Sequence, residues 1–141
     1  MKSALKKVLV PYLRSEGFIG KYPEFMRREK DILHLLSIEF DKYGGGFFLE
    51  FAPHPAGDKT MPWGEVVPEQ NLTTAHSPFD MRARLQEYGT ENSTNESWFR
   101  FDSLTRDECE DLANRVVKLF PQVNEWLREH KVGPNISTIK P

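Results

Sequence analysis

The sequence predicts an α+β fold, in which an antiparallel sheet of about five strands carries an N-terminal helix and a long C-terminal helix on one face. Apolar residues recur at helical spacing at both ends of the chain, while the middle holds short segments that alternate between apolar and polar. The connections between most of these segments are too short for parallel crossovers, which need a dozen or more residues. With 141 residues the chain suits one domain. We place this domain at residues 1–132 and expect a loose tail at 133–141.

The first helix is expected at residues 2–16, where leucines and other apolar residues recur at helical spacing. Pro11 lies inside this pattern and predicts a kink or a late helix start, because proline lacks the backbone N–H. Gly17 is suited to end the helix in the left-handed conformation, with Phe18 packing back on it.

Strands are expected at residues 25–28, 32–40, 47–51, 80–85 and 98–102. The glycine-rich stretch 41–46 favours a hairpin between the second and third of them. Residues 52–78 hold five of the ten prolines and show no periodicity. A connection of this length is typically a functional or mobile loop. A polar loop is expected at 91–97.

The C-terminal helix begins at a capping box formed by Thr105 and Glu108, whose side chains can each satisfy a free backbone donor. Its expected buried stripe comprises Cys109, Leu112, Ala113, Val116, Phe120, Val123 and Leu127. Pro121 predicts a kink or a split, and Gly133 with Pro134 is expected to stop the helix.

Strand alternation assigns the side chains to two faces of the sheet. The face expected under the helices is strongly apolar and comprises Ile32, His34, Leu36, Ile38, Phe40, Phe47, Leu49, Phe51, Met81, Ala83, Leu85, Phe99 and Phe101. The opposite, outer face is amphipathic and comprises Leu33, Leu35, Ser37, Glu39, Phe48, Glu50, Arg82, Arg84, Trp98 and Arg100. His34 is therefore expected to be a hydrogen-bonded core or edge histidine.

Composition excludes several classes of function. The net charge of -2 gives no basic footprint for nucleic acid. No apolar run is long enough to span a membrane, and the N-terminus lacks a signal peptide, so we expect a cytoplasmic protein. The single cysteine and the wide spacing of the four histidines indicate no metal site, and no cofactor is expected.

The helix ending in Gly17-Phe18 is followed by the segment 25–28, the strand 32–40, and the glycine-rich turn with the strand 47–51. Taken in this order, these segments resemble an uncharacterised bacterial family called domain of unknown function 4304. The segments 82–85 and 98–101 also resemble the family pattern, and the similarity covers roughly residues 2–127. The resemblance supports the α+β fold and implies no catalytic residue.

The first functional hypothesis is a non-enzymatic binding or accessory module that holds a protein partner on the outer sheet face or on the proline-rich loop. The expected contact residues are Arg82, Arg84, Trp98 and Arg100, because Trp and Arg are the residue types that most often anchor protein interfaces. The competing interpretation is that the loop folds over this face and that the arginines pair with Glu39 and Glu50.

The second hypothesis is a small-molecule binder or a hydrolytic enzyme built around the loop, with His54, Asp58 and His76 folded together. A homodimer formed through a sheet edge is the third, so the protein is expected to be a monomer or a homodimer.

Overall fold

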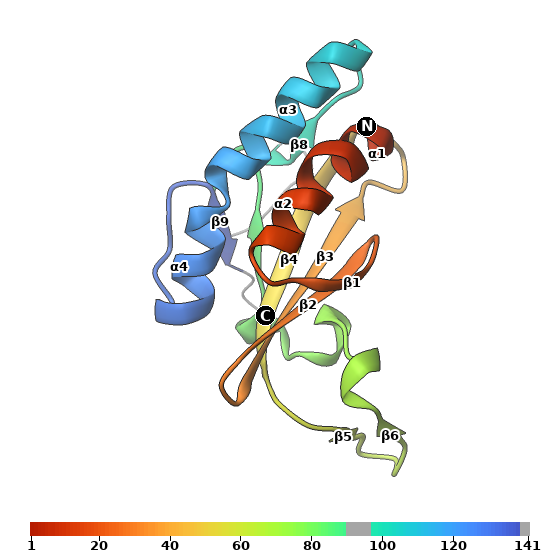
Figure 1. Cartoon of the computed structure of the whole chain (residues 1–141), viewed down its shortest axis with the longest axis vertical. Coiled ribbons are helices and arrows are strands. Elements are labelled where there is room, and N and C mark those ends of the chain that lie inside the picture. Colours follow the sequence, from red (N-terminus) through yellow and green to blue (C-terminus); the bar gives the residue numbers. More distant parts are fainter. Residues whose placement is uncertain (90–96, 139–141) are drawn as a thin grey trace.

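The computed structural model describes residues 1–89 and 97–138 and confirms the α+β fold (Figure 1). Its described part contains one seven-stranded sheet in the order β1-β2-β3-β4-β7-β9, with β8 also paired to β4, and every pairing is antiparallel. The strands are β1 (Ile19–Lys21), β2 (Glu24–Glu29), β3 (Ile32–Phe40), β4 (Gly46–Pro55), β7 (Ala83–Leu85), β8 (Phe99–Arg100) and β9 (Ile136–Thr138). A separate pair joins β5 (Lys59–Thr60) to β6 (Val66–Val67).

The N-terminal helix runs through α1 (Lys2–Ala4), a π-helical turn η1 (Leu5–Leu9) and α2 (Val10–Ser15). Its irregular turn lies directly before Pro11, and there the Val10 N–H bonds to the Leu5 carbonyl, one residue further back than in an α-helix. The helix ends as the sequence predicts. Gly17 has φ +91°, and the Phe18 N–H donates to the Leu13 carbonyl at 2.9 Å.

Pro121 splits the C-terminal helix, as predicted, into α3 (Arg106–Leu119) and α4 (Pro121–Glu129). The capping box is also confirmed. The Glu108 N–H donates to the Thr105 hydroxyl at 3.2 Å, and the Glu108 carboxylate accepts from the Thr105 N–H at 3.0 Å.

We expect Thr105→Ala to lower the free energy of unfolding by about 1 kcal/mol, because the substitution leaves a backbone donor of the first helical turn unsatisfied. Urea unfolding measures the change. Thr60→Ala, on the small two-stranded sheet, is the control, and an equal effect of both substitutions would contradict the role of the cap.

The main core lies between one face of the sheet and the helices. Figure 1 shows α2 and α3 lying across the same face of the sheet, with α4 following at the end of α3. The fully buried aromatic residues of this layer are Phe18, Phe47, Phe51, Phe99 and Phe120. Most of the predicted apolar face belongs to this core, which confirms the side to which the helices were assigned.

Strand β4 is longer than predicted, because Pro53 and Pro55 continue it. The Asp41 N–H donates to the Gly46 carbonyl and the Ala56 N–H to the Asp31 carbonyl. Alternate residues of β4 therefore bond to β3, and both proline nitrogens face the opposite edge. No described strand lies there, since β7 pairs only with residues 49–51. Since no described strand pairs there, the N–H groups that the two prolines lack remove no hydrogen bond of the sheet. Their absence also protects this edge from pairing with another strand.

The rest of the 52–78 segment is less irregular than expected. It holds the β5–β6 pair and two short 3-10 turns, η2 (Glu69–Asn71) and η3 (Thr74–His76). The predicted strand 80–85 begins as a further turn, η4 (Phe79–Met81), and only Ala83–Leu85 is extended. The predicted strand 98–102 is limited to Phe99–Arg100. Of the predicted loop 91–97, all but Ser97 lies outside the described residues.

The prediction of a loose tail from residue 133 is wrong for Ile136–Thr138, which form β9 beside β7. Ile136 is only 2% exposed, and the Asn135 side chain donates to the Glu87 carbonyl at 2.8 Å. Three residues are too few to show a period, so the sequence could not reveal this strand.

Candidate functional site

The outer face of the sheet is divided into two parts. Over one part, Leu72 packs on Leu33 and Leu35 and forms a small second core. The Thr74 hydroxyl lies 3.1 Å from the Ser37 hydroxyl and 3.4 Å from a Glu50 carboxylate oxygen. Here the loop covers the sheet, as the competing interpretation of this face predicts.

The second part is an aromatic patch of Phe48, Arg84 and Trp98. The Arg84 guanidinium lies 4.2 Å from the centroid of the Phe48 ring, and the Phe48 and Trp98 rings are 4.7 Å apart. Arg84 Nε is also 3.5 Å from a Glu50 oxygen, an ion pair whose geometry does not make a hydrogen bond. Trp98 is half-buried. The patch lines a hollow of about 410 Å³ together with the side chains of Glu39 and Tyr43, among others.

The two other predicted contact residues make their contacts elsewhere. Arg82 donates to the carbonyls of Ala75 and Ser77 at 2.9 and 2.8 Å and so holds the loop. Arg100 pairs with Asp102 at 2.8 Å, next to the glycine-rich turn. The structure therefore joins Arg84 and Trp98 through Phe48, and it gives Arg82 and Arg100 separate roles.

His54, which lies on β4, and Asp58 and His76, which follow in the loop, make local contacts with the backbone. His54 Nδ1 lies 2.8 Å from the Pro55 carbonyl, Asp58 accepts from the Glu69 N–H at 2.8 Å, and His76 accepts from the Thr73 N–H at 2.9 Å. His54 and Asp58 line one groove, and His76 does not. In residues 1–89 and 97–138, no group of three or more His, Cys, Asp or Glu residues could hold a metal ion.

Three carboxylates, those of Glu24, Glu39 and Glu50, lie near one another on the outer face. Glu39 accepts a hydrogen bond from the Ser37 hydroxyl at 3.0 Å, and Glu50 pairs with Arg84. The Glu24 side chain makes neither a hydrogen bond nor an ion pair with any described residue. Burial first, and then the charges of Glu39 and Glu50, raise the Glu24 pKa to about 7. The sequence pattern does not indicate Glu24, because this residue lies one position before the predicted strand 25–28.

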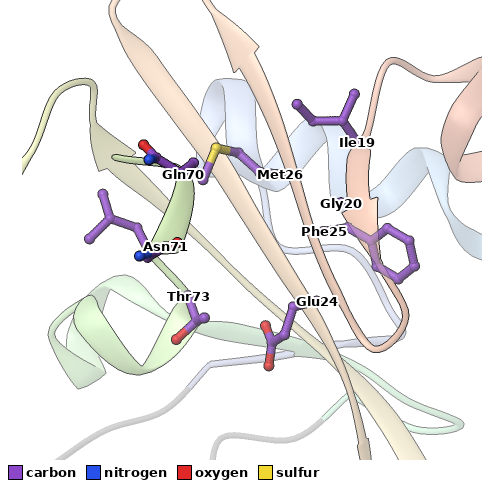
Figure 2. A pocket seen from close by; sticks show the side chains of 9 residues that line it. Ile19, Gly20, Glu24, Phe25, Met26, Gln70, Asn71 and Thr73 are labelled. Carbon is purple, nitrogen blue, oxygen red and sulfur yellow. The ribbon is translucent and has the colours of Figure 1, made fainter. Parts of the chain in front are cut away.

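Glu24 also lines a groove of about 360 Å³ between the β1–β2 hairpin and the loop (Figure 2). The other lining residues are Ile19, Gly20, Phe25, Met26, Gln70, Asn71, Leu72 and Thr73. Because its two walls are far apart in the sequence, no local motif could have indicated this groove.

A buried polar network lies on the opposite face, under the helices. His34, which is 2% exposed, accepts a hydrogen bond from Arg27 Nε at 3.0 Å, and this confirms the prediction of a hydrogen-bonded core histidine. Burial first, and then the Arg27 charge, lowers the His34 pKa to about 4. Glu29 bridges this network to Arg128 at 2.6 Å. The imidazole is therefore a neutral structural acceptor.

The fold and its outer face define a small α+β domain with helices on one side of an antiparallel sheet. The chain belongs to the family described as Domain of unknown function (DUF4304), which matches residues 9–129. Neither a curated protein nor a solved structure matches the chain. None of the helices in the described part is long and apolar enough to cross a membrane.

Proposed function

We propose that this domain is a non-enzymatic binding module that holds a protein partner on the aromatic patch of Phe48, Arg84 and Trp98. The observation that carries the proposal is the stacking of Arg84 on Phe48 beside the half-buried Trp98, in a hollow of the outer face. Interface hot spots combine such Trp and Arg anchors with a surrounding rim. Tyr43, 84% exposed, adds a further aromatic side chain to this hollow.

The loop residues give less support to a hydrolytic enzyme. His54, Asp58 and His76 each hold the local backbone, and they do not line one common groove. A general base must lie within hydrogen-bond reach of the group it serves. We therefore favour a binding module over a hydrolytic enzyme built around this loop.

We expect Trp98→Ala to reduce capture of the partner at least about tenfold, as truncation of a hot-spot residue does. Affinity capture from an extract of the source organism, with quantitative mass spectrometry, measures the change. Trp63→Ala is the matched control, because Trp63 is 70% exposed and lies outside the patch. The free energy of unfolding should fall by about 1 kcal/mol in Trp98→Ala, through the lost contact with Phe48.

A protein captured by the wild type and by Trp63→Ala, but lost with Trp98→Ala and with Arg84→Ala, would support the proposal. Equal capture by all four proteins, or equal loss in both tryptophan variants, would refute it.

A further inference from the structure

The groove between the β1–β2 hairpin and residues 70–73 has an apolar end and an acidic end. Figure 2 shows Met26 beside Gln70 at one end, and Glu24 beside Thr73 at the other. Ile19, which is 66% exposed, gives the groove a second apolar side chain that a ligand can cover. The volume of about 360 Å³ lies within the range of small-molecule sites.

The charges around the acidic end favour a cation. Glu24 has neighbouring carboxylates on β3 and β4, namely Glu39 and Glu50. The nearby cations only partly offset them. Arg84 is paired with Glu50, and Lys21, opposite Glu24 on β1, is exposed and makes no ion pair with any described residue. A ligand cation at Glu24 would relieve the repulsion among the three carboxylates.

We propose that this groove binds a small alkylammonium ion, with its alkyl chain against Ile19 and Met26 and its ammonium group on the Glu24 carboxylate. Thr73 supplies a hydroxyl acceptor at the same end. No residue of the aromatic patch lines this groove, so each site can fail its test without the other.

The first test uses n-hexylammonium chloride as the probe, with 1-hexanol and sodium hexanoate as ligands of equal chain length. Titration of the whole chain, followed by amide chemical shifts, should perturb residues 19–26 and 70–73. Hexylammonium should bind about tenfold more tightly than hexanol, as one charge-assisted hydrogen bond allows, and hexanoate should bind more weakly than hexanol. Equal affinities for the three ligands, no binding of hexylammonium, or shifts confined to other residues would overturn the proposal.

The second test separates the charge from the apolar contact. Glu24→Gln should weaken hexylammonium binding about tenfold and leave hexanol binding unchanged, because only the charge is removed. Glu129→Gln, an exposed carboxylate on α4, is the matched control and should change neither affinity. Ile19→Ala should weaken both ligands about threefold, and Val132→Ala, also at an exposed apolar residue, should weaken neither. Equal losses in Glu24→Gln and Glu129→Gln would overturn the assignment.

The third test is the pH dependence of binding. Hexylammonium stays cationic near neutral pH, so its affinity should rise about tenfold between about pH 6 and about pH 8 as Glu24 ionises. Glu24→Gln leaves Lys21, Arg84, Glu39, Glu50 and, on the loop, His76 in place. A pH dependence that persists in Glu24→Gln would therefore come from another group and overturn the proposal.

The last test concerns the source of the cation. Nα-acetyl-lysine methylamide presents the same ammonium group as part of a peptide. Tighter binding of this compound than of hexylammonium would assign the groove to a protein side chain and overturn the proposal. Trp98→Ala should bind hexylammonium as the wild type does, since Trp98 does not line the groove.

Discussion

Replacing Arg27 with alanine should lower the free energy of unfolding by about 4 kcal/mol, as the loss of one partner from a buried charged network does. Arg27 is only 4% exposed. It donates to His34 Nδ1 at 3.0 Å, to the Glu16 carbonyl at 3.1 Å and to Asn124 Oδ1 at 2.8 Å. Its guanidinium also lies 4.4 Å from the centroid of the Phe18 ring. The substitution removes this packing and leaves buried acceptors without a donor.

Urea unfolding of Arg27→Ala and of Arg115→Ala gives a matched comparison. Arg115 makes a two-pronged ion pair with Glu87 at 2.6 Å, but this pair lies at the surface. Its loss should cost less than about 1 kcal/mol, because exposed ion pairs are screened and mobile. Equal costs for the two arginines would show that the Arg27 network contributes no more than a surface pair.

The alternation of apolar and polar residues along the strands predicts much of the fold. The face of β3 and β4 that packs under the helices was predicted correctly, because these strands are long enough to show their period. The contacts of Arg27 were beyond such reasoning. Arg27 meets Glu16 and Asn124 across 11 and 97 residues of sequence, and only the packing of β2 against both helical ends brings them together.

The candidate site is predicted less completely than the fold, because much of it also depends on tertiary contacts. Alternation could place Arg84 and Trp98 near Phe48, which the structure confirms as neighbours. It failed for Arg82, because β7 begins only at Ala83, and outside a strand the sequence does not fix the direction of a side chain. The groove at Glu24 depends on the position of residues 70–73 over β2, which is a tertiary contact without a local signal.

His34 and Glu24, on opposite faces of the sheet, should each make the free energy of unfolding depend on pH. Their effects have opposite signs, so they largely cancel in the wild type and become visible only when one group is replaced. The His34 pKa falls to about 4 in the folded chain, so the unfolded chain binds more protons below neutral pH. The stability contributed by neutral His34 is complete above pH 6.5 and is lost as the pH falls toward about 4. The Glu24 pKa rises from 4.5 to about 7, which has the opposite effect. Its contribution is complete below pH 4.5 and is lost as the pH rises toward about 7.

Between pH 4.5 and pH 6.5 both His34 and Glu24 contribute to the pH dependence of the free energy of unfolding, and their contributions oppose each other. We therefore expect the free energy of unfolding of the wild type to change by less than about 1 kcal/mol across this window. Glu24→Gln removes the contribution of Glu24 to this pH dependence and leaves that of His34. Its free energy of unfolding should fall by about 2 kcal/mol between about pH 7.5 and about pH 5, through His34 alone.

Above neutral pH the same variant should be more stable than the wild type by about 1–2 kcal/mol, because the repulsion at Glu24 is gone and its partial exposure limits the gain. Urea unfolding at several pH values and constant ionic strength measures both effects, with Glu129→Gln as the control that should follow the wild type. Parallel profiles for the wild type and Glu24→Gln would mean that Glu24 is not the opposing group. A Glu24→Gln profile that stays flat below neutral pH would instead show that His34 does not resist protonation, since nothing would then oppose its slope.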